Sequence, residues 1–452
     1  MSISIEQRRQ HRLMTIEKSL AKRHRKENIF RRLGLMAVVT GMTLVAILFA
    51  SILMRGVPAF WQATFYVDVY FDPEVVELAP KPERESGESQ FAFDERYTQW
   101  MTQAGLVNWQ ALIDRAVEDA LGEEVEPRQL RDLRALVTSG ERYALRDRFV
   151  EDPSLLGQTV ELKMLASANV DVWIKGNIDR DLPDARQQLS AQTRAWADQL
   201  DEQGVIRNAF STSLFLNTDS RSSLASAGLA GAFMGSLFMM MVVITLSVPL
   251  GVSSAIYLEE FAPKNRLTDL IEININNLAA VPSIVFGLLG ASIFIGYLRL
   301  PLSAPLVGGL VLTLMTLPTI IIATRASLRS IPPSIRQAAL GIGASRVQTV
   351  FHHVLPLALP GILTGSILGV AQALGETAPL LLIGMNAFVA NVPGTPLDQS
   401  TALPVQIYLW QGNELRNFFE ARTSAAIIVL LGLMLSLNAL AIWLRKKFET
   451  RW

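Results

Sequence analysis

The chain has 452 residues, half of them hydrophobic, and it carries 41 basic and 41 acidic residues, so that its formal net charge is zero. This length allows more than one domain, and the neutral charge gives no indication of a nucleic-acid partner. There is no cysteine, which excludes disulfides and thiolate metal sites.

Charge and apolar residues are segregated along the chain. Residues 1–32 carry ten Lys/Arg and three Asp/Glu, whereas residues 60–222 carry 29 acidic and 17 basic residues. Six apolar stretches outside the acidic region are long enough to cross a hydrocarbon layer, which needs about 20 residues. They are Leu33–Met54, Leu229–Tyr257, Leu278–Leu298, Leu306–Thr324, Gly361–Met385 and Ala425–Leu444. The pattern predicts an all-α polytopic membrane protein with six spans.

The first predicted span, Leu33–Met54, resembles an anchor more than a secretory signal. Its apolar run is longer than that of a signal peptide, and no clean small-residue cleavage site follows it before Arg55. We expect an uncleaved anchor, and cleavage of this segment is the alternative.

Basic residues predict the orientation. With the N-terminus inside, the inner segments hold 20 Lys/Arg in 85 residues and the short outer loops hold three in 44. This asymmetry is the positive-inside pattern, so both termini are expected in the cytoplasm. The inner segments are 1–32, 259–270, 325–357 and 445–452, and the outer loops are 299–305 and 386–422.

Residues 55–228 are then an extracytoplasmic insert after the first span. Alternating β-branched and aromatic residues predict strands at 63–71 and 160–174, and apolar periodicity predicts helices at 107–122 and 185–204, each closed by a glycine. The insert is long enough for its own α+β core. Because it shows no metal cluster, nucleophile–base pair or phosphate loop, we expect a structural or docking cap.

The remaining five predicted spans form a core at 229–444, followed by a short tail at 445–452. The chain lacks the glycine-rich phosphate loop that ends in Gly-Lys-Ser/Thr; its Lys–Gly neighbours, Lys175 and Gly176, occur in the reverse order. We therefore expect no nucleotide hydrolysis of that type in this chain, and no bound cofactor or metal.

The inner loop 325–357 has the pattern of a helix, a glycine corner and a second helix. Ser330 is positioned to cap a helix that opens at Pro332, and Ser345 is positioned to cap the next one. Gly341 and Gly343 separate the two helices. A corner of such small residues allows another protein to pack closely. The adjacent His352 and His353 point about 100° apart on a helix, which argues against a metal site.

This loop resembles the EAA loop of ABC importer permeases, whose short helix sits in a groove of the partner ATPase. The matching residues are Gln337, Ala338, Ala339, Gly343, Leu355 and Pro356. Two positions depart from the family pattern: Gln337 replaces the usual Glu, and His353 stands where an aliphatic residue is common. The loss of charge at Gln337 removes any salt bridge from that position.

Several ordered motifs between residues 222 and 448 resemble the PstA family of phosphate ABC importer permeases. The motifs are "PLGVSSAIYLEEFAP" (249–263), "VPSIVFGLLG" (281–290), "PGILTGSILGVAQALGETAPLL" (360–381) and "LPVQIY" (403–408). The acidic insert resembles that of a long form of this permease. The resemblance implies a type I ABC importer permease core.

Glu376 is a carboxylate within an apolar segment, and such residues are usually functional. On one helix, Gly365, Gly369, Gln372, Glu376 and Pro379 would form a single stripe. The alternative is a structural hydrogen bond between packed helices. The family commonly has Arg where Gln372 stands, so the obvious cation for an anionic substrate is missing.

The segment Gln372, Glu376 and Thr377 is therefore a candidate part of the translocation path. Because a carboxylate repels phosphate, we expect Glu376 to orient a cation, which a partner subunit can supply.

The resemblance implies a transmembrane permease of an ATP-driven phosphate importer in a bacterial inner membrane. Its implied partners, besides membrane lipid, are a homologous second permease, two ATPase subunits that bind ATP and Mg, and an extracytoplasmic phosphate-binding protein. The alternatives are a permease for another oxyanion, such as sulfate or molybdate, and a membrane-anchored sensor or scaffold.

Overall fold

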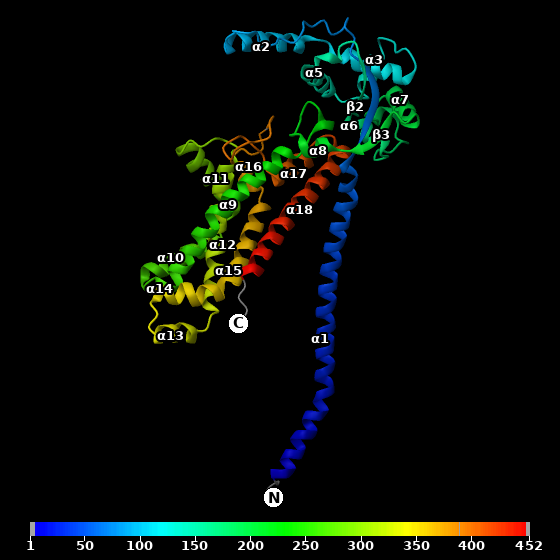
Figure 1. The fold of residues 1–452 in the computed structure, drawn as a ribbon. Coiled ribbons are helices and arrows are strands. Elements are labelled where there is room, and N and C mark those ends of the chain that lie inside the picture. The colour runs from blue at the N-terminus through cyan, green and yellow to red at the C-terminus, as the bar shows by residue number, and fades with distance from the viewer. Residues whose placement is uncertain (1–4, 388, 449–452) are drawn as a thin grey trace. The chain divides into compact units, whose positions relative to one another are not determined.

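The structure, a computed structural model, describes residues 5–387 and 389–448 and separates into two units, 1–55 and 56–452 (Figure 1). The first unit consists of helix α1 (Ile5–Gly56), which continues into the second unit by one residue. The predicted span at 33–54 lies inside α1, but the helix begins much earlier, so the basic segment before the span is helical as well. Part of the predicted tail, residues 449–452, lies outside the described residues.

The insert contains a three-stranded antiparallel sheet in the order β2-β1-β3. The strands are β1 (Trp61–Tyr70), β2 (Thr159–Leu165) and β3 (Ile206–Phe210). The helices around the sheet are α2 (Gln90–Leu106), α3 (Trp109–Leu121), α4 (Leu130–Arg134), α5 (Glu141–Glu151), α6 (Ala168–Ile174), α7 (Ala191–Glu202) and α8 (Thr212–Leu216). The fold class predicted for this region, α+β, is confirmed.

The sequence pattern overestimates one strand in the insert. The segment 160–174 was expected to be continuous β structure, but only its first part forms β2, and its second part is helix α6. Ser167 separates the two elements and caps α6, accepting a hydrogen bond from the Val170 amide. An N-terminal cap of this kind outweighs the β propensity of the valines that follow. The helix predicted at 107–122 forms as α3, whereas the helix predicted at 185–204 forms only from Ala191 onward, as α7, because Ser190 caps its start.

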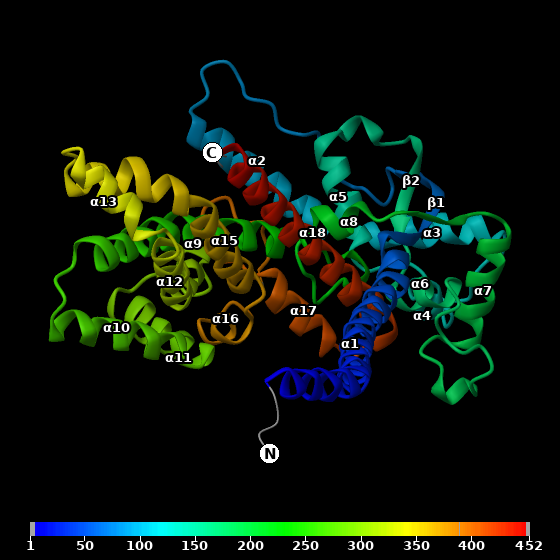
Figure 2. The same cartoon turned by 90° about the horizontal axis from the view of Figure 1, so that it is seen from below.

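Within the described residues, eight further helices of different lengths build the core. They are α9 (Ala230–Ile256), α10 (Arg266–Ala279), α11 (Ser283–Gly290), α12 (Pro305–Arg329), α15 (Leu355–Leu374), α16 (Ala378–Leu382), α17 (Leu403–Gln411) and α18 (Arg416–Phe448). The loop between α12 and α15 contains α13 (Pro333–Gly341) and α14 (Arg346–Thr349). Figures 1 and 2 show α9, α12 and α15 as neighbours, and glycines allow their close approach: a Cβ at Gly365 would collide with Ala323, and one at Gly251 with Ile320.

By length and composition, five helices among the described residues can cross a membrane, and a bent pair makes a sixth. The bent pair is α10 and α11 with the π-helical turn after it, Ala291–Tyr297, and its two halves meet at 101°. The straight third span expected at Leu278–Leu298 is therefore wrong. Pro282, which cannot continue a helix at this point, lies at the bend. The class of polytopic helical membrane protein is confirmed.

The hydrophobic core of the insert continues into the helical core. Buried residues of the sheet and its helices form one cluster with Leu229, Leu403, Trp410, Phe419 and Ala425, which belong to α9, α17 and α18 or lie directly before them. Because apolar contact runs without a break from one part to the other, the insert is attached to the core by packing as well as by the chain connection that leads into α9.

Candidate functional site

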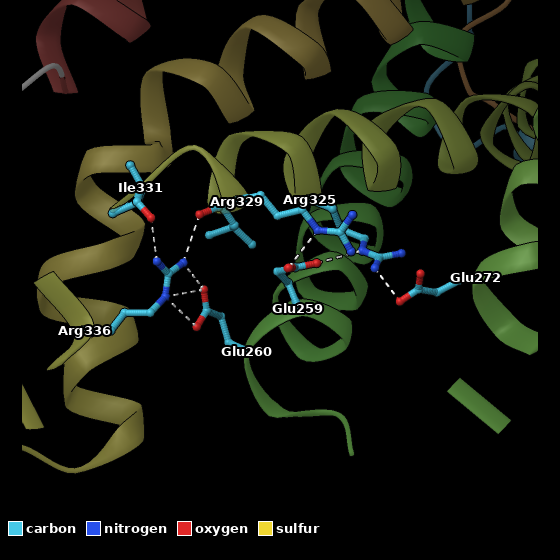
Figure 3. A network of polar contacts seen from close by, with 8 residues as sticks. Glu259, Glu260, Glu272, Arg325, Arg329, Ile331 and Arg336 are labelled. Carbon is cyan, nitrogen blue, oxygen red and sulfur yellow. Dashed lines mark hydrogen bonds and ion pairs between the residues drawn. The ribbon is translucent and has the colours of Figure 1, made fainter. Parts of the chain in front are cut away.

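A network of ion pairs lies at the end of the core that carries the 325–357 loop, here called the loop end (Figure 3). Glu259, in the π-helical turn that ends α9, accepts hydrogen bonds from two arginines of α12. The Arg325 Nε–Glu259 Oε2 distance is 3.1 Å and the Arg329 Nε–Glu259 Oε1 distance is 2.8 Å. Arg325 also donates to Glu272 of α10. Ion pairs therefore connect three helices, α9, α10 and α12.

Glu260, the next residue, holds the loop helix α13. Arg336 of α13 donates to Glu260 through Nε and Nη2, with an Nη2–Oε1 distance of 2.6 Å. The same guanidinium donates to the backbone carbonyls of Ile331 at 2.8 Å and Leu328 at 2.9 Å. A planar guanidinium with several simultaneous partners has one preferred orientation, so this contact fixes the base of α13 against α9 and the end of α12.

The glycine corner after α13 has the backbone geometry that only glycine adopts without strain. Gly343 has φ +92°, and its amide donates to the carbonyl of Leu340. Ser345 then caps α14 in a capping box with Gln348, as the sequence predicts for Ser345. The prediction for Ser330 is wrong: Ser330 ends α12, and its hydroxyl donates to the carbonyl of Ser327.

The predicted coupling residues lie on both sides of this corner. Gln337 and Ala338 of α13 are exposed, as is Gly343. Ala339 is buried, while Leu355 and Pro356 are half-buried at the start of α15. Large apolar side chains project beside them: Ile342 is 84% exposed, and the remaining ones, Leu340, Val347 and Phe351, are about half exposed. The corner therefore presents an exposed apolar surface on an anchored helix. Such an exposed apolar patch is typical of a surface that binds another protein.

The segment around Glu376 differs from its predicted geometry. Helix α15 ends at Leu374, and α16 begins at Ala378, so Gln372 and Glu376 do not lie on one continuous helix. The stripe expected from Gly365 to Pro379 is therefore wrong beyond Leu374. Pro379, in the first turn of α16, lacks the amide that a continuous helix requires there.

The break leaves polar groups without partners. The side chains of Gln372, Glu376 and Thr377 form no hydrogen bond or ion pair within 5–387 and 389–448. Glu376 is half-buried, and its own amide donates to the carbonyl of Ala373. The structure thus brings these three residues together at one helix break, with a carboxylate that is available to a partner.

Sequence reasoning missed the charge network at the loop end. The sequence contains a signal for this network: the adjacent carboxylates Glu259 and Glu260 follow one long apolar run, and Arg325 follows another. Two consecutive carboxylates at the end of a span require partners, which lie 66 and 76 positions away along the chain. Among the described residues, no group of three or more His, Asp or Glu side chains is arranged to hold a metal ion.

These features define a polytopic membrane protein whose loop end anchors a short helix with an exposed apolar corner. The family profile described as "Binding-protein-dependent transport system inner membrane component" matches residues 247–452, and a profile described as a domain of unknown function matches residues 17–184.

Curated relatives agree with the first of these profiles. The "Probable ABC transporter permease protein YqgH" of Bacillus subtilis (strain 168) is 30% identical over 228 residues, which cover 49% of this chain and 71% of the relative. Also from that organism, "Probable ABC transporter permease protein YqgI" is 34% identical over 173 residues, or 37% of this chain and 56% of the relative. The "Phosphate transport system permease protein PstA 1" of Mycobacterium tuberculosis (strain ATCC 25618 / H37Rv) is 35% identical over 179 residues, or 38% and 58%.

The chain belongs to the ABC transporter permeases. It is a multi-pass inner-membrane protein, and as a permease subunit it is not itself an enzyme. The match spans little more than half the length of YqgI and PstA 1.

Proposed function

We propose that the chain is the transmembrane permease subunit of an ATP-driven importer for inorganic phosphate. The names of the PstA relatives support phosphate as the substrate. The observation that carries a transport role is the anchored loop helix: Arg336 fixes α13 to Glu260 of α9, while Ile342 at the end of α13 is almost fully exposed. The apolar surface can bind a partner protein, and the rigid attachment of α13 can pass a displacement of that partner to α9 and α12.

In this proposal the corner formed by α13 and α14 docks into a cytoplasmic ATPase. Movement of α13 passes through the Arg336–Glu260 contact to the end of α9, and from the neighbouring Glu259 through Arg325 to Glu272 of α10. Gln337, Ala338 and Gly343 form the docking side of this unit, Ala339 is buried and supports α13 from behind, and Leu355 and Pro356 lie at the junction with α15.

The proposed assembly contains a homologous second permease, two ATPase subunits and an extracytoplasmic phosphate-binding protein. ATP and Mg would be bound by the ATPase subunits, because this chain lacks the phosphate loop. The loop end then faces the cytoplasm with both termini, and the insert faces the binding protein. The excess of basic residues in the loop-end segments supports this orientation.

The helix break at Gly375 is the proposed contribution of this chain to the translocation path. Interrupted helices in membrane proteins are tolerated where they line protein or water rather than lipid. Gln372 and Thr377 offer neutral hydrogen-bonding groups, and Glu376 offers a charge. Since phosphate is an anion, Glu376 would position a cation from the second permease rather than contact the substrate.

The test is reconstitution. The chain is co-expressed with the genes for its expected partner subunits, purified through a tag on this chain, and incorporated into proteoliposomes with the binding protein and internal ATP. ATP-dependent uptake of labelled phosphate is expected, with weaker uptake of sulfate and molybdate. Uptake of another oxyanion in preference to phosphate would overturn the substrate assignment. A preparation that recovers no ATPase and transports none of these anions would favour a sensor or scaffold.

A further inference from the structure

Four aromatic side chains form an exposed cluster where the insert joins the helices. The ring of Phe215 stacks on both Phe60 and Phe210, with ring centroids 5.7 Å apart in each pair. Trp61 meets Phe210 edge-on, with centroids 6.2 Å apart. Phe210, Trp61 and Phe215 are 55%, 45% and 39% exposed. These four rings are called the aromatic cluster below, and a contiguous exposed apolar patch of this kind is typical of an interaction surface.

The backbone that carries the aromatic cluster is fixed by hydrogen bonds. Trp61, at the start of β1, is paired in register with Phe210, at the end of β3. The Ser211 amide donates to the carbonyl of Phe60 at 2.8 Å, and Nζ of Lys175 donates to the carbonyl of Trp61 at 2.6 Å. The rings are therefore presented by the sheet and its hydrogen-bonded ends, so their exposure is a property of the fold.

Two observations place the aromatic cluster at the insert end of the membrane spans. In the sequence, Phe60 and Trp61 follow the first predicted span by a few residues. In the structure, a Cβ on Gly56 would lie only 2.9 Å from the backbone nitrogen of Ala425, where the apolar run of α18 begins. The polar interfacial layer on each side of the hydrocarbon is roughly 5–8 Å thick. Rings at this level therefore lie in the layer between hydrocarbon and water.

The indole of Trp61 differs from those of the buried tryptophans. Five buried indoles each donate their N–H to an acceptor in the protein, and they belong to Trp100, Trp109, Trp173, Trp196 and Trp410. The N–H of Trp61 has no hydrogen-bond partner within 5–387 and 389–448. Tryptophan is enriched at membrane interfaces, because its ring is apolar and its N–H is a donor. The free N–H is thus available to an acceptor outside the chain.

We propose that the aromatic cluster anchors the insert to the membrane surface. The three phenylalanine rings enter the boundary between lipid headgroups and acyl chains, and the N–H of Trp61 donates to a lipid oxygen atom. The cluster is continuous with a surface that lipid covers: the turn Val57–Phe60 contacts α18, whose exposed side chains include Leu435 and Leu440. The insert is then held by lipid as well as by its packing on the core, whatever substrate the permease transports.

The chain contains no cysteine, so a single introduced cysteine can carry a spin label at one chosen position. Phe210→Cys is labelled in the purified full-length chain and reconstituted into vesicles of phosphatidylethanolamine and phosphatidylglycerol. Collisions of the label with oxygen, which concentrates in lipid, should exceed collisions with a water-soluble nickel chelate several-fold. The matched control is Phe91→Cys on α2, 79% exposed and outside the aromatic cluster, where the nickel chelate should dominate. Leu440→Cys on α18 gives the reference value for lipid.

A label at Phe210→Cys that meets the nickel chelate as often as the label at Phe91→Cys would overturn the anchor. Protection from both reagents would overturn it as well, because it would show that protein covers the aromatic cluster.

A second measurement leaves the phenylalanines in place. In vesicles whose acyl chains carry bromine, which quenches tryptophan fluorescence on contact, the wild type should lose more intensity than Trp61→Phe. Trp196→Phe, which removes a buried tryptophan, should lose as much intensity as the wild type. Equal losses for the wild type and Trp61→Phe would contradict the proposal.

Discussion

Arg422 of α18 donates a hydrogen bond to Gln62 of β1, 360 positions earlier in the chain, with an Nη2–Oε1 distance of 3.0 Å. The same guanidinium donates to the backbone carbonyls of Ala225, at 2.7 Å, and Ala227 in the linker between insert and core. Arg422 is 2% exposed. One buried cation thus joins the sheet, the linker and the C-terminal helix, and its hydrogen bonds compensate for the loss of hydration.

Replacing Arg422 should loosen the insert from the core. Arg422→Met keeps the length of the side chain but leaves the Ala227 carbonyl without its donor, while the Ala225 carbonyl keeps its hydrogen bond from Gln62 and Gln62 Oε1 keeps those from Ser211 and Ser213. The loss of these hydrogen bonds should lower the free energy of unfolding by about 1–3 kcal/mol. Thermal unfolding in detergent and limited proteolysis of the linker at 217–229 measure the effect. Arg416→Met, on the same helix but exposed and without a partner among the described residues, is the control. Equal behaviour of the two variants would show that Arg422 does not hold the insert.

The Arg336–Glu260 contact should be needed for coupling rather than for insertion. Glu260→Gln weakens the charge-assisted bonds that orient α13, so ATP-dependent uptake should fall at least tenfold while the protein still reaches the membrane. Lys264→Gln, an exposed charge nearby in sequence that forms no ion pair within the described ranges, should have little effect. Uptake normalised to membrane level decides between them, and normal uptake by Glu260→Gln would remove this contact from the coupling path.

Two glycines at the loop corner provide a matched pair. At both Gly341 and Gly343 an added Cβ would meet no other atom of the described chain within 4 Å. Only Gly343 has a positive φ. Gly343→Ala should therefore strain the corner by about 1–2 kcal/mol and reduce stimulation of the partner ATPase.

Gly341→Ala, at the last residue of α13 and without a positive φ, should be neutral or slightly stabilising. ATPase assays on the reconstituted assembly compare the two variants. If both behave alike, the left-handed corner is not important for coupling.

Glu376→Gln should leave folding intact but reduce transport sharply, because Glu376 has no partner to lose among the described residues. The break after Leu374 changes the expectation for Gln372→Arg: without a continuous helix, an i,i+4 pair with Glu376 is not available. Gln372→Arg should therefore be no better tolerated than Gln372→Leu. Uptake assays normalised to membrane level measure all three, and full transport by Glu376→Gln would assign this residue a structural role.

The insert should become less stable as the pH rises past 5. Burial raises the pKa of Glu141 to about 7, against the opposing effect of a hydrogen bond from the Leu165 amide at 3.0 Å. The folded state then binds more protons than the unfolded state between pH 4.5 and 7, so the free energy of unfolding decreases across this window, by up to about 3 kcal/mol.

Glu141→Gln keeps an acceptor for the Leu165 amide and removes the titration. Thermal unfolding of the wild type from pH 5 to 8 should show a decline in Tm that is smaller in Glu141→Gln. Parallel pH profiles for the two proteins would contradict the assignment.

Features that depend on neighbouring residues were predictable from the sequence. Apolar stretches of about 20 residues indicated a polytopic membrane protein, and the glycine and serine spacing after α13 indicated the corner that Gly343 and the Ser345 capping box form. Gly122 likewise ends α3 in the left-handed conformation. In each case the determining interaction lies within a few residues, so the local sequence contains it.

Only the tertiary structure decided which distant groups meet. The pairs Arg336–Glu260 and Arg422–Gln62 join residues that no local pattern relates, and the bend between α10 and α11 and the break after Leu374 replace two spans that hydropathy alone reads as continuous. Hydropathy measures how much a segment prefers an apolar surrounding, whereas a bend or a buried charge is stabilised by the particular groups packed against it. Those groups are brought together by folding, from positions 76 and 360 residues apart.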